Sequence, residues 1–163
     1  MDGISEILAT YNCVSLDEKI QFELDGVVEK EIKQAYCIEN LEFCVSCMDY
    51  TTLKVSDTEE SVKNFTADLL KKLKKFNLRD VAAVCVFSNY AGIVREGLKG
   101  TEIQTAVVAG NFPNSQRFTE IKLAECKMSI GAGAQEVDVV ISVGDILEKN
   151  YEKVYRELKA IRK

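Results

Sequence analysis

The carboxylate of Asp138 is the residue whose type and position most clearly suggest chemistry. It interrupts an otherwise apolar run from Val137 to Val143, and a carboxylate in a buried strand is costly unless it is paired or used. A carboxylate that projects from such a strand can have a shifted pKa, as proton transfer requires. The alternative is a structural carboxylate paired with a buried lysine.

Further polar side chains occur where other apolar runs end, and these positions matter because reactive groups of parallel α/β folds gather at the carboxyl ends of strands. Asp49 and Thr51 follow the first run and place a carboxylate and a hydroxyl there. Asp49 could equally cap a turn. No Walker loop and no GxGxxG sequence follows any of these runs, which removes the usual support for nucleotide binding.

The six cysteines favour neither a metal site nor a disulfide framework. Cys44 and Cys47 form a lone CxxC in a segment predicted to be a strand, where the two thiols would point to opposite faces. The chain has no histidine, so a tetrahedral zinc site lacks ligands. Four of the cysteines lie in apolar segments that predict small buried side chains: Cys37, Cys44, Cys85 and Cys126.

The elements that must position these residues follow from hydrophobic periodicity. Two helices are expected before residue 40, the first with an apolar stripe from Ile4 to Tyr11 and the second capped by Ser15 and Glu18. Near-continuous apolar runs then predict four buried parallel strands: Phe43 to Met48, Val81 to Phe87, Thr105 to Gly110 and Val137 to Val143.

Helical segments alternate with these strands. The first is expected to be capped by Ser56 and Glu59, and the second to run from about Tyr90 to Leu98. The third is expected around Phe118, Ile121, Glu125 and Met128. The last carries Leu147, Tyr151, Val154, Leu158 and Ile161. The alternation predicts a parallel α/β sheet, either doubly wound or part of a (β/α)8 barrel.

Composition limits the classes of function. The net charge of -5 is spread along 163 residues without a basic patch, which argues against nucleic acid as a partner. No apolar run is long enough to span a bilayer, and the amino terminus lacks the features of a signal peptide, so we expect no membrane association and a cytoplasmic location.

The strand ends resemble those of the 2-deoxyribose-5-phosphate aldolase family. The segments that carry the resemblance occur in the family's order: Met48-Asp-Tyr-Thr-Thr-Leu53, Ala82-Ala-Val-Cys-Val86, Asn111-Phe-Pro113 and Gly133-Ala-Gln-Glu-Val-Asp-Val-Val140. The resemblance implies a (β/α)8 TIM barrel of which the chain holds the first four βα units as a half barrel, with residues 1–40 as an N-terminal helical extension and residues 41–163 as the barrel part.

The resemblance also implies a reaction and roles for residues. Members of this family are class I aldolases, carbon-carbon lyases that need no cofactor and no metal. They cleave 2-deoxy-D-ribose 5-phosphate reversibly to glyceraldehyde 3-phosphate and acetaldehyde through a lysine Schiff base. By this resemblance Asp138 is the catalytic proton-relay residue, and Asp49, Thr51 and Cys85 bind the phosphosugar substrate.

Departures from the family pattern are also visible. Ser88, Ser115 and Ser142 stand where proline, glycine, and asparagine or proline are usual. The family's Schiff-base lysine lies on the sixth strand, so we expect none in this chain, which we interpret as truncated and inactive alone. Lys54 is close to a strand end but is expected to face water.

A half barrel leaves the edges of its first and last strands unpaired, and such edges invite pairing with another chain. We therefore expect a homo-oligomer formed through the barrel edges. The alternative to an aldolase is a non-catalytic α/β half-barrel that serves as a binding or assembly module.

Overall fold

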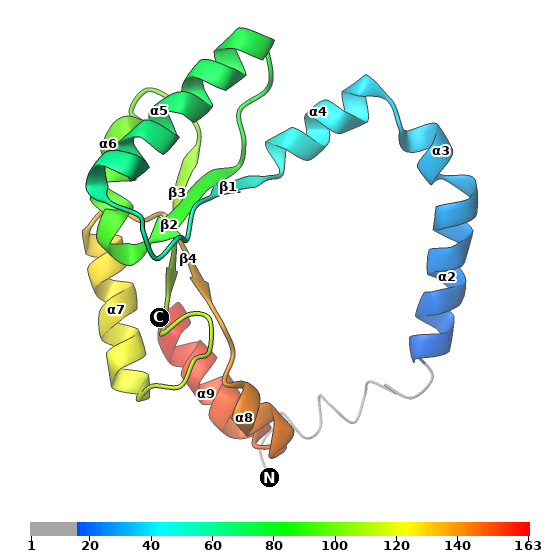
Figure 1. The fold of residues 1–163 in the computed structure, drawn as a ribbon. Coiled ribbons are helices and arrows are strands. Elements are labelled where there is room, and N and C mark those ends of the chain that lie inside the picture. The colour runs from blue at the N-terminus through cyan, green and yellow to red at the C-terminus, as the bar shows by residue number, and fades with distance from the viewer. Residues whose placement is uncertain (1–15) are drawn as a thin grey trace. The chain divides into compact units, whose positions relative to one another are not determined.

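A computed structural model describes residues 16–163 (Figure 1). The first predicted helix and Ser15 of the predicted capping box lie outside the described residues. The chain divides into two compact units, residues 1–42 and 43–163, which are described separately.

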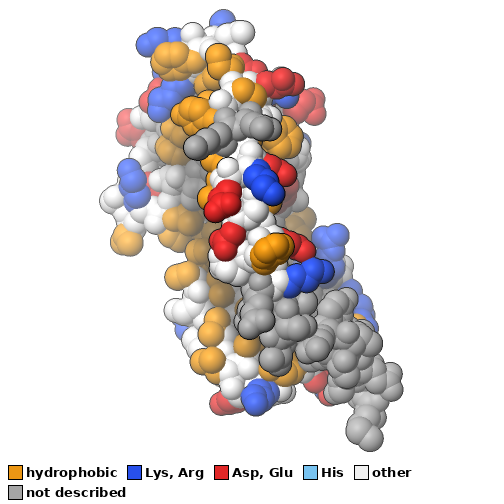
Figure 2. Space-filling model, turned by 90° about the vertical axis from the view of Figure 1, so that its right-hand side faces the viewer, with side chains coloured by type: hydrophobic (Ala, Val, Ile, Leu, Met, Phe, Trp, Pro, Cys, Tyr) orange, Lys and Arg blue, Asp and Glu red, His pale blue; other side chains and the backbone are white. Residues whose placement is uncertain are grey.

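The described part of the first unit is helical. It contains α2 (Leu16–Lys30), α3 (Ile32–Ala35) and the start of α4 (Ile38–Ser46). Many of its large apolar side chains are exposed, among them Phe22 at 81%. Figure 2 shows hydrophobic side chains interspersed with acidic and basic ones on the face that it draws.

The strand predicted from Phe43 to Met48 is wrong, because α4 continues through this segment to Ser46. A short apolar run has no periodicity that separates a strand from a helix, and here the helix forms. Cys44 therefore lies in a helix with Cys47 just after it, and both are exposed and free, as is Cys37. The expectations of opposite faces and of buried thiols at Cys37 and Cys44 were wrong.

Four parallel strands form one sheet in the order β1-β2-β3-β4. Their bounds are β1 Asp49–Thr51, β2 Ala83–Phe87, β3 Gln104–Ala109 and β4 Glu136–Val139. The prediction of four parallel βα units is confirmed, although β4 ends at Val139 because a further helix, α8 (Val143–Leu147), begins where the strand was expected to finish.

The remaining helices follow their strands as expected: α5 Glu59–Phe76, a 3-10 turn Ser88–Tyr90 and α6 Ala91–Gly97, α7 Thr119–Gly131, and α9 Tyr151–Arg162. The cap of α5 was mispredicted. Thr58 is its N-cap: its hydroxyl accepts a hydrogen bond from the Ser61 amide, and its own amide donates to the Ser61 hydroxyl oxygen. Ser61, at the third helical position, thus accepts the hydrogen bond that a glutamate or glutamine accepts in the usual capping box.

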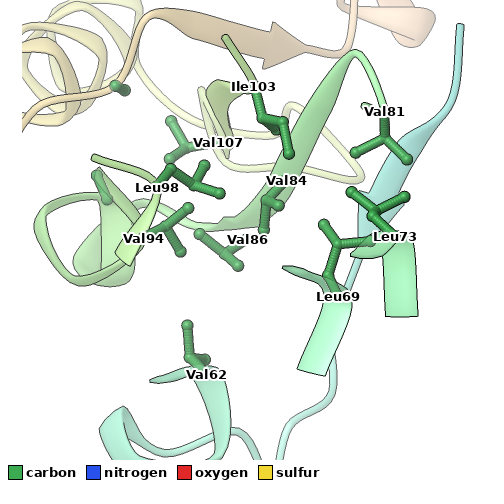
Figure 3. Packing of buried hydrophobic residues seen from close by; sticks show 12 residues of the cluster. Val62, Leu69, Leu73, Val81, Val84, Val86, Val94, Leu98, Ile103 and Val107 are labelled. Atoms are coloured by element: carbon green, nitrogen blue, oxygen red, sulfur yellow. The ribbon is translucent and has the colours of Figure 1, made fainter. Parts of the chain in front are cut away.

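The main core lies between one face of the sheet and the helices that cover it (Figure 3). Val84, Val86 and Val107 point from the sheet toward Val62 and Leu69 of α5, with further apolar side chains from α6. Each such side chain contributes about 1.5–3 kcal/mol when it is fully buried. This core covers one face of the sheet, and the side chains of the opposite face are not part of it.

The buried face of helix α7 contains polar residues. Its buried side chains are Lys122, Cys126 and Ser129, whereas Phe118, Ile121 and Met128, around which the helix was expected, are exposed. The expected position of the helix is confirmed, and its buried face is built around the ion pair of Lys122.

Candidate active site

Strand register places the four predicted site residues on one face of the sheet. Residues that pair across parallel strands point to the same side. Thr51 pairs with Cys85, Cys85 with Ala106, and Val108, two residues beyond Ala106, with Asp138. Asp49 lies two residues before Thr51 and so shares this face, which is opposite the helix-covered core.

Hydrogen bonds join these residues in two pairs. The Cys85 thiol lies 3.7 Å from Oδ2 of Asp138 and donates to it. Thr51 donates its hydroxyl hydrogen to the carbonyl oxygen of Asp49, 3.1 Å away. Asp138 itself is exposed, contrary to the expected burial, because alternation along β4 turns its side chain away from the helices. No lysine of the described residues pairs with it, so the lysine-paired alternative fails for these residues.

The electrostatics of the site are acidic. Burial raises the pKa of the Cys85 thiol to about 12, with further contributions from the charges of Asp138 and Asp49 and from the hydrogen bond to Asp138. Burial, followed by the charge of Asp138, also raises the pKa of Asp49 above its ordinary 3.8. At neutral pH Cys85 is therefore a neutral thiol, which can donate a hydrogen bond. It is not a good nucleophile, because only the thiolate form of cysteine is one.

The loop that follows β1 is held by Asp57 rather than by Asp49. The Asp57 carboxylate accepts from the hydroxyl of buried Thr52 at 2.9 Å and from the Lys54 amide at 2.9 Å. Tyr90 donates to the Asp57 carbonyl oxygen at 2.7 Å. Lys54 is exposed, as its position in the loop suggests.

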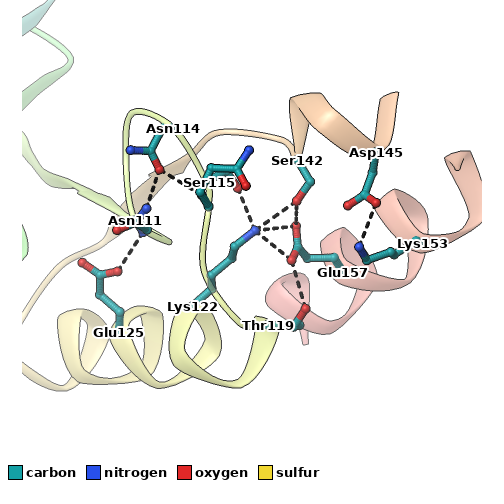
Figure 4. A network of polar contacts seen from close by, with 11 residues as sticks. Asn111, Asn114, Ser115, Thr119, Lys122, Glu125, Ser142, Asp145, Lys153 and Glu157 are labelled. Atoms are coloured by element: carbon teal, nitrogen blue, oxygen red, sulfur yellow. Dashed lines mark hydrogen bonds and ion pairs between the residues drawn. The ribbon is translucent and has the colours of Figure 1, made fainter. Parts of the chain in front are cut away.

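A second polar cluster, which sequence analysis missed, lies behind the ends of β3 and β4 (Figure 4). Lys122 is 1% exposed, and its ammonium donates to Ser115 at 2.7 Å, to Ser142 at 3.0 Å and to Glu157 at 2.8 Å. Glu157 accepts two more hydrogen bonds, from Ser142 at 2.7 Å and from Thr119 at 3.0 Å. All three donor positions of the ammonium are used, so this lysine is structural.

Burial raises the pKa of Glu157, but hydrogen bonds from Lys122, Ser142 and Thr119 outweigh it and hold that pKa below 4.5. The sequence did hold a signal for this ion pair. Lys122 shares a helix face with Cys126, and Glu157 shares one with Val154, so opposite charges occur on two faces that are otherwise expected to be buried.

The cluster supports the loop after β3. Gly110, Asn111 and Ser115 all have positive φ, and Gly110 leaves room for Val139, whose Cγ1 would lie 3.3 Å from an added Cβ. The Asn111 amide donates to Glu125 of α7 at 3.0 Å. A cavity of about 420 Å³ adjoins this region between α7, α8 and α9.

Within residues 16–163 as described, no group of three His, Cys, Asp or Glu side chains could hold a metal ion. No described helix is long and apolar enough to cross a membrane.

No protein-family model matches the chain, but individual relatives do. The chain is 40% identical over 114 residues to a deoxyribose-phosphate aldolase of Clostridium novyi, and 38% identical over 114 residues to one of Clostridium tetani. These matches cover 70% of this chain and 48% and 49% of the two relatives, so the chain spans about half of their length.

Solved structures agree. A tetrameric deoxyribose phosphate aldolase of Aeropyrum pernix superposes with a TM-score of 0.58 at 29% identity, over 74% of this chain and 46% of that one. A chain described as an aldolase, QR15, superposes with a TM-score of 0.61 at 26% identity, over 72% of this chain and 48% of that one. In sequence and in fold, this chain is therefore similar to about half of a deoxyribose-phosphate aldolase.

Proposed function

We propose that the chain supplies half of the active site of a cytoplasmic class I aldolase that cleaves 2-deoxy-D-ribose 5-phosphate to acetaldehyde and glyceraldehyde 3-phosphate. The observation that carries this proposal is the gathering of Asp49, Thr51, Cys85 and Asp138 on the sheet face opposite the helices. The aldolase relatives support the choice of substrate.

The proposed chemistry assigns one role to each side chain. With the sugar held as an imine on a lysine, cleavage of its C2–C3 bond needs a base for the proton of the C3 hydroxyl, while the electron pair moves onto the iminium. Asp138 is the proton relay, because its carboxylate is exposed on this face. Asp49, Thr51 and the Cys85 thiol bind the substrate by hydrogen bonds and contact.

We propose that none of the described lysines forms the Schiff base. Lys122 is buried and fully hydrogen-bonded behind the sheet, and Lys54 is exposed in a loop. A nucleophilic lysine needs a lowered pKa, which arises from burial or neighbouring positive charge. We therefore propose that these 163 residues bind the sugar phosphate but do not cleave it.

Binding can be tested without turnover. Titration of isotope-labelled protein with 2-deoxyribose 5-phosphate should shift the amide resonances of Thr51, Cys85 and Asp138, with inorganic phosphate as the ligand control and Asp138→Asn as the protein control. Shifts confined to the cavity between α7 and α9 would contradict the assigned site.

Imine formation is tested separately. After incubation with acetaldehyde and borohydride, peptide mass spectrometry should find no lysine modified above the level of the urea-unfolded protein. Stoichiometric modification of one lysine in the folded protein would overturn the proposed inactivity. Absence of both binding and modification would favour the non-catalytic binding or assembly module.

A further inference from the structure

Two free cysteines lie at the end of helix α4. Cys44 is in the last turn of the helix, and Cys47 directly follows its last residue, Ser46. Both thiols are free and exposed, whereas Cys85 and Cys126 are buried. Neither Cys44 nor Cys47 has a role in the proposed aldolase chemistry. They are two neighbouring thiols that a reagent in solution can reach.

The backbone brings these two thiols to one side of the chain. The Cys47 amide donates to the Cys44 carbonyl oxygen at 3.1 Å. The Met48 amide donates in the same way to the Val45 carbonyl oxygen, also at 3.1 Å. Bonds between residues three apart are those of a 3-10 turn, in which side chains three positions apart eclipse. The helix end therefore turns both thiols to the same side.

The dimensions of such a turn suit a disulfide. Four residues in a tight turn have their first and last Cα atoms less than about 7 Å apart. A disulfide joins residues whose Cα atoms are about 4.4–6.8 Å apart. The turn between Cys44 and Cys47 thus holds two thiols within the reach of one bond.

We propose that Cys44 and Cys47 form a reversible intramolecular disulfide, which constrains the chain where it enters β1, and that a low-molecular-weight disulfide such as glutathione disulfide is the oxidant. One protein thiolate attacks a sulfur of the oxidant and releases one glutathione. The second protein thiolate attacks the protein sulfur of this mixed disulfide and releases the other glutathione. The protein thiols lose two electrons and two protons in total, and glutathione disulfide gains them as two glutathione thiols.

The constraint acts next to the candidate active site. Cys47 is two residues before Asp49, the first residue of β1. Between them, the Met48 carbonyl oxygen accepts from the Ala82 amide at 3.0 Å, so this segment is already attached to the sheet at one end. A disulfide fixes its other end to α4. Because exposed disulfides are among the labile ones, a reductant returns the dithiol and releases the constraint.

Oxidation is tested on the whole chain, and the test measures redox state rather than activity. After equilibration with glutathione and glutathione disulfide, free thiols are blocked with iodoacetamide and tryptic peptides are analysed by mass spectrometry. The peptide of residues 34–54, which contains three of the six cysteines, should carry one blocked thiol, at Cys37, and a link between Cys44 and Cys47.

Single variants identify the two partners. Cys44→Ser and Cys47→Ser should each hold one glutathione on the remaining cysteine of the pair, because the second exchange step has no thiol. The matched variant Cys37→Ser also replaces an exposed cysteine and should form the link as the wild type does. A wild type that keeps both thiols, that holds glutathione on one of them, or that links either to Cys37 would overturn the proposal.

Two further measurements test the turn and the constraint. At one ratio of glutathione to its disulfide, the pair should be several-fold more oxidised in the folded protein than in urea, because the folded turn holds both thiols on one side. Oxidation should also shift the amide resonance of Thr51 in Cys37→Ser but not in Cys44→Ser. Equal oxidation in the folded and unfolded protein would overturn the role of the turn, and an unshifted Thr51 amide would overturn the constraint on β1.

Discussion

The buried ion pair between Lys122 and Glu157 should be the most sensitive polar contact in the fold. Lys122→Met keeps the length of the side chain but leaves a carboxylate that is 8% exposed without its cation. Breaking a buried pair in this way costs about 3–5 kcal/mol. We expect the lower end, about 3 kcal/mol, because Ser142 and Thr119 still donate to the carboxylate.

Urea unfolding followed by circular dichroism measures this loss. For a unit of this size, about 3 kcal/mol lowers Tm by roughly 10 °C. Lys153→Met is the matched control, because Lys153 pairs with Asp145 at 2.8 Å but its side chain is 63% exposed. This variant should have the same urea midpoint as the wild type. Equal urea midpoints for the two variants would show that burial of the Lys122–Glu157 pair adds nothing to its contribution to stability.

A double variant separates the charge from the packing. In Lys122→Met with Glu157→Gln, no unpaired charge remains, so the double variant should be more stable than Lys122→Met alone. Removal of both charges of a buried pair is often nearly neutral. If the double variant is as unstable as the single one, lost packing rather than the stranded carboxylate causes the destabilisation.

Acid should weaken the same contact. The pKa of Glu157 is lower in the folded protein than its ordinary 4.5, so its contribution to stability is present above pH 4.5 and is lost as the pH falls through the folded value. The free energy of unfolding of the wild type should therefore fall below pH 4.5 more steeply than that of Glu157→Gln. Parallel pH profiles would contradict the assignment.

Three further predictions concern the candidate site and its support. Cys85, with its pKa near 12, should resist iodoacetamide in the folded protein while the exposed cysteines react, as peptide mass spectrometry would show; equal rates would contradict its burial. Asp138→Asn should lower the pKa of Asp49 toward 3.8, followed by carboxyl NMR shifts, because the neighbouring charge raises it; an unchanged pKa would show that burial alone raises it. Ser115→Ala removes one acceptor of the Lys122 ammonium and should cost about 1 kcal/mol in urea unfolding; no change would mean that water replaces the hydroxyl.

The parallel sheet could be predicted because its strands are short apolar runs separated by amphipathic helices, a pattern that few folds share. The first strand could not. Its apolar segment at Phe43 to Val45 forms the end of α4, and the strand itself, Asp49–Thr51, is made of the polar residues that were assigned to the strand end. Hydrophobicity identified the strands that consist of apolar runs, and β1 is not one of them, because Asp49 and Thr51 are exposed and only Tyr50 between them is half-buried.

The residues of the candidate site could be chosen from sequence because they lie at defined strand positions, and alternation then fixes their common face. The solvent exposure of the Asp138 carboxylate could not be predicted in the same way. Exposure of its carboxylate depends on what covers the inner face of the sheet, which no local pattern encodes. Lys122 was missed for a related reason: its burial depends on Glu157, 35 residues away in sequence.

The two polar clusters are connected through the chain segment that runs from β4 to the start of α8. Asp138 lies in the strand and Ser142 lies four residues later, where its hydroxyl both accepts from Lys122 and donates to Glu157. Ser115 fixes the neighbouring loop to the same ammonium. Each of these serines is hydrogen-bonded to the ion pair, so both hydroxyls are part of the structural cluster. The pair behind the sheet thus anchors the segment that holds the carboxylate in front of it.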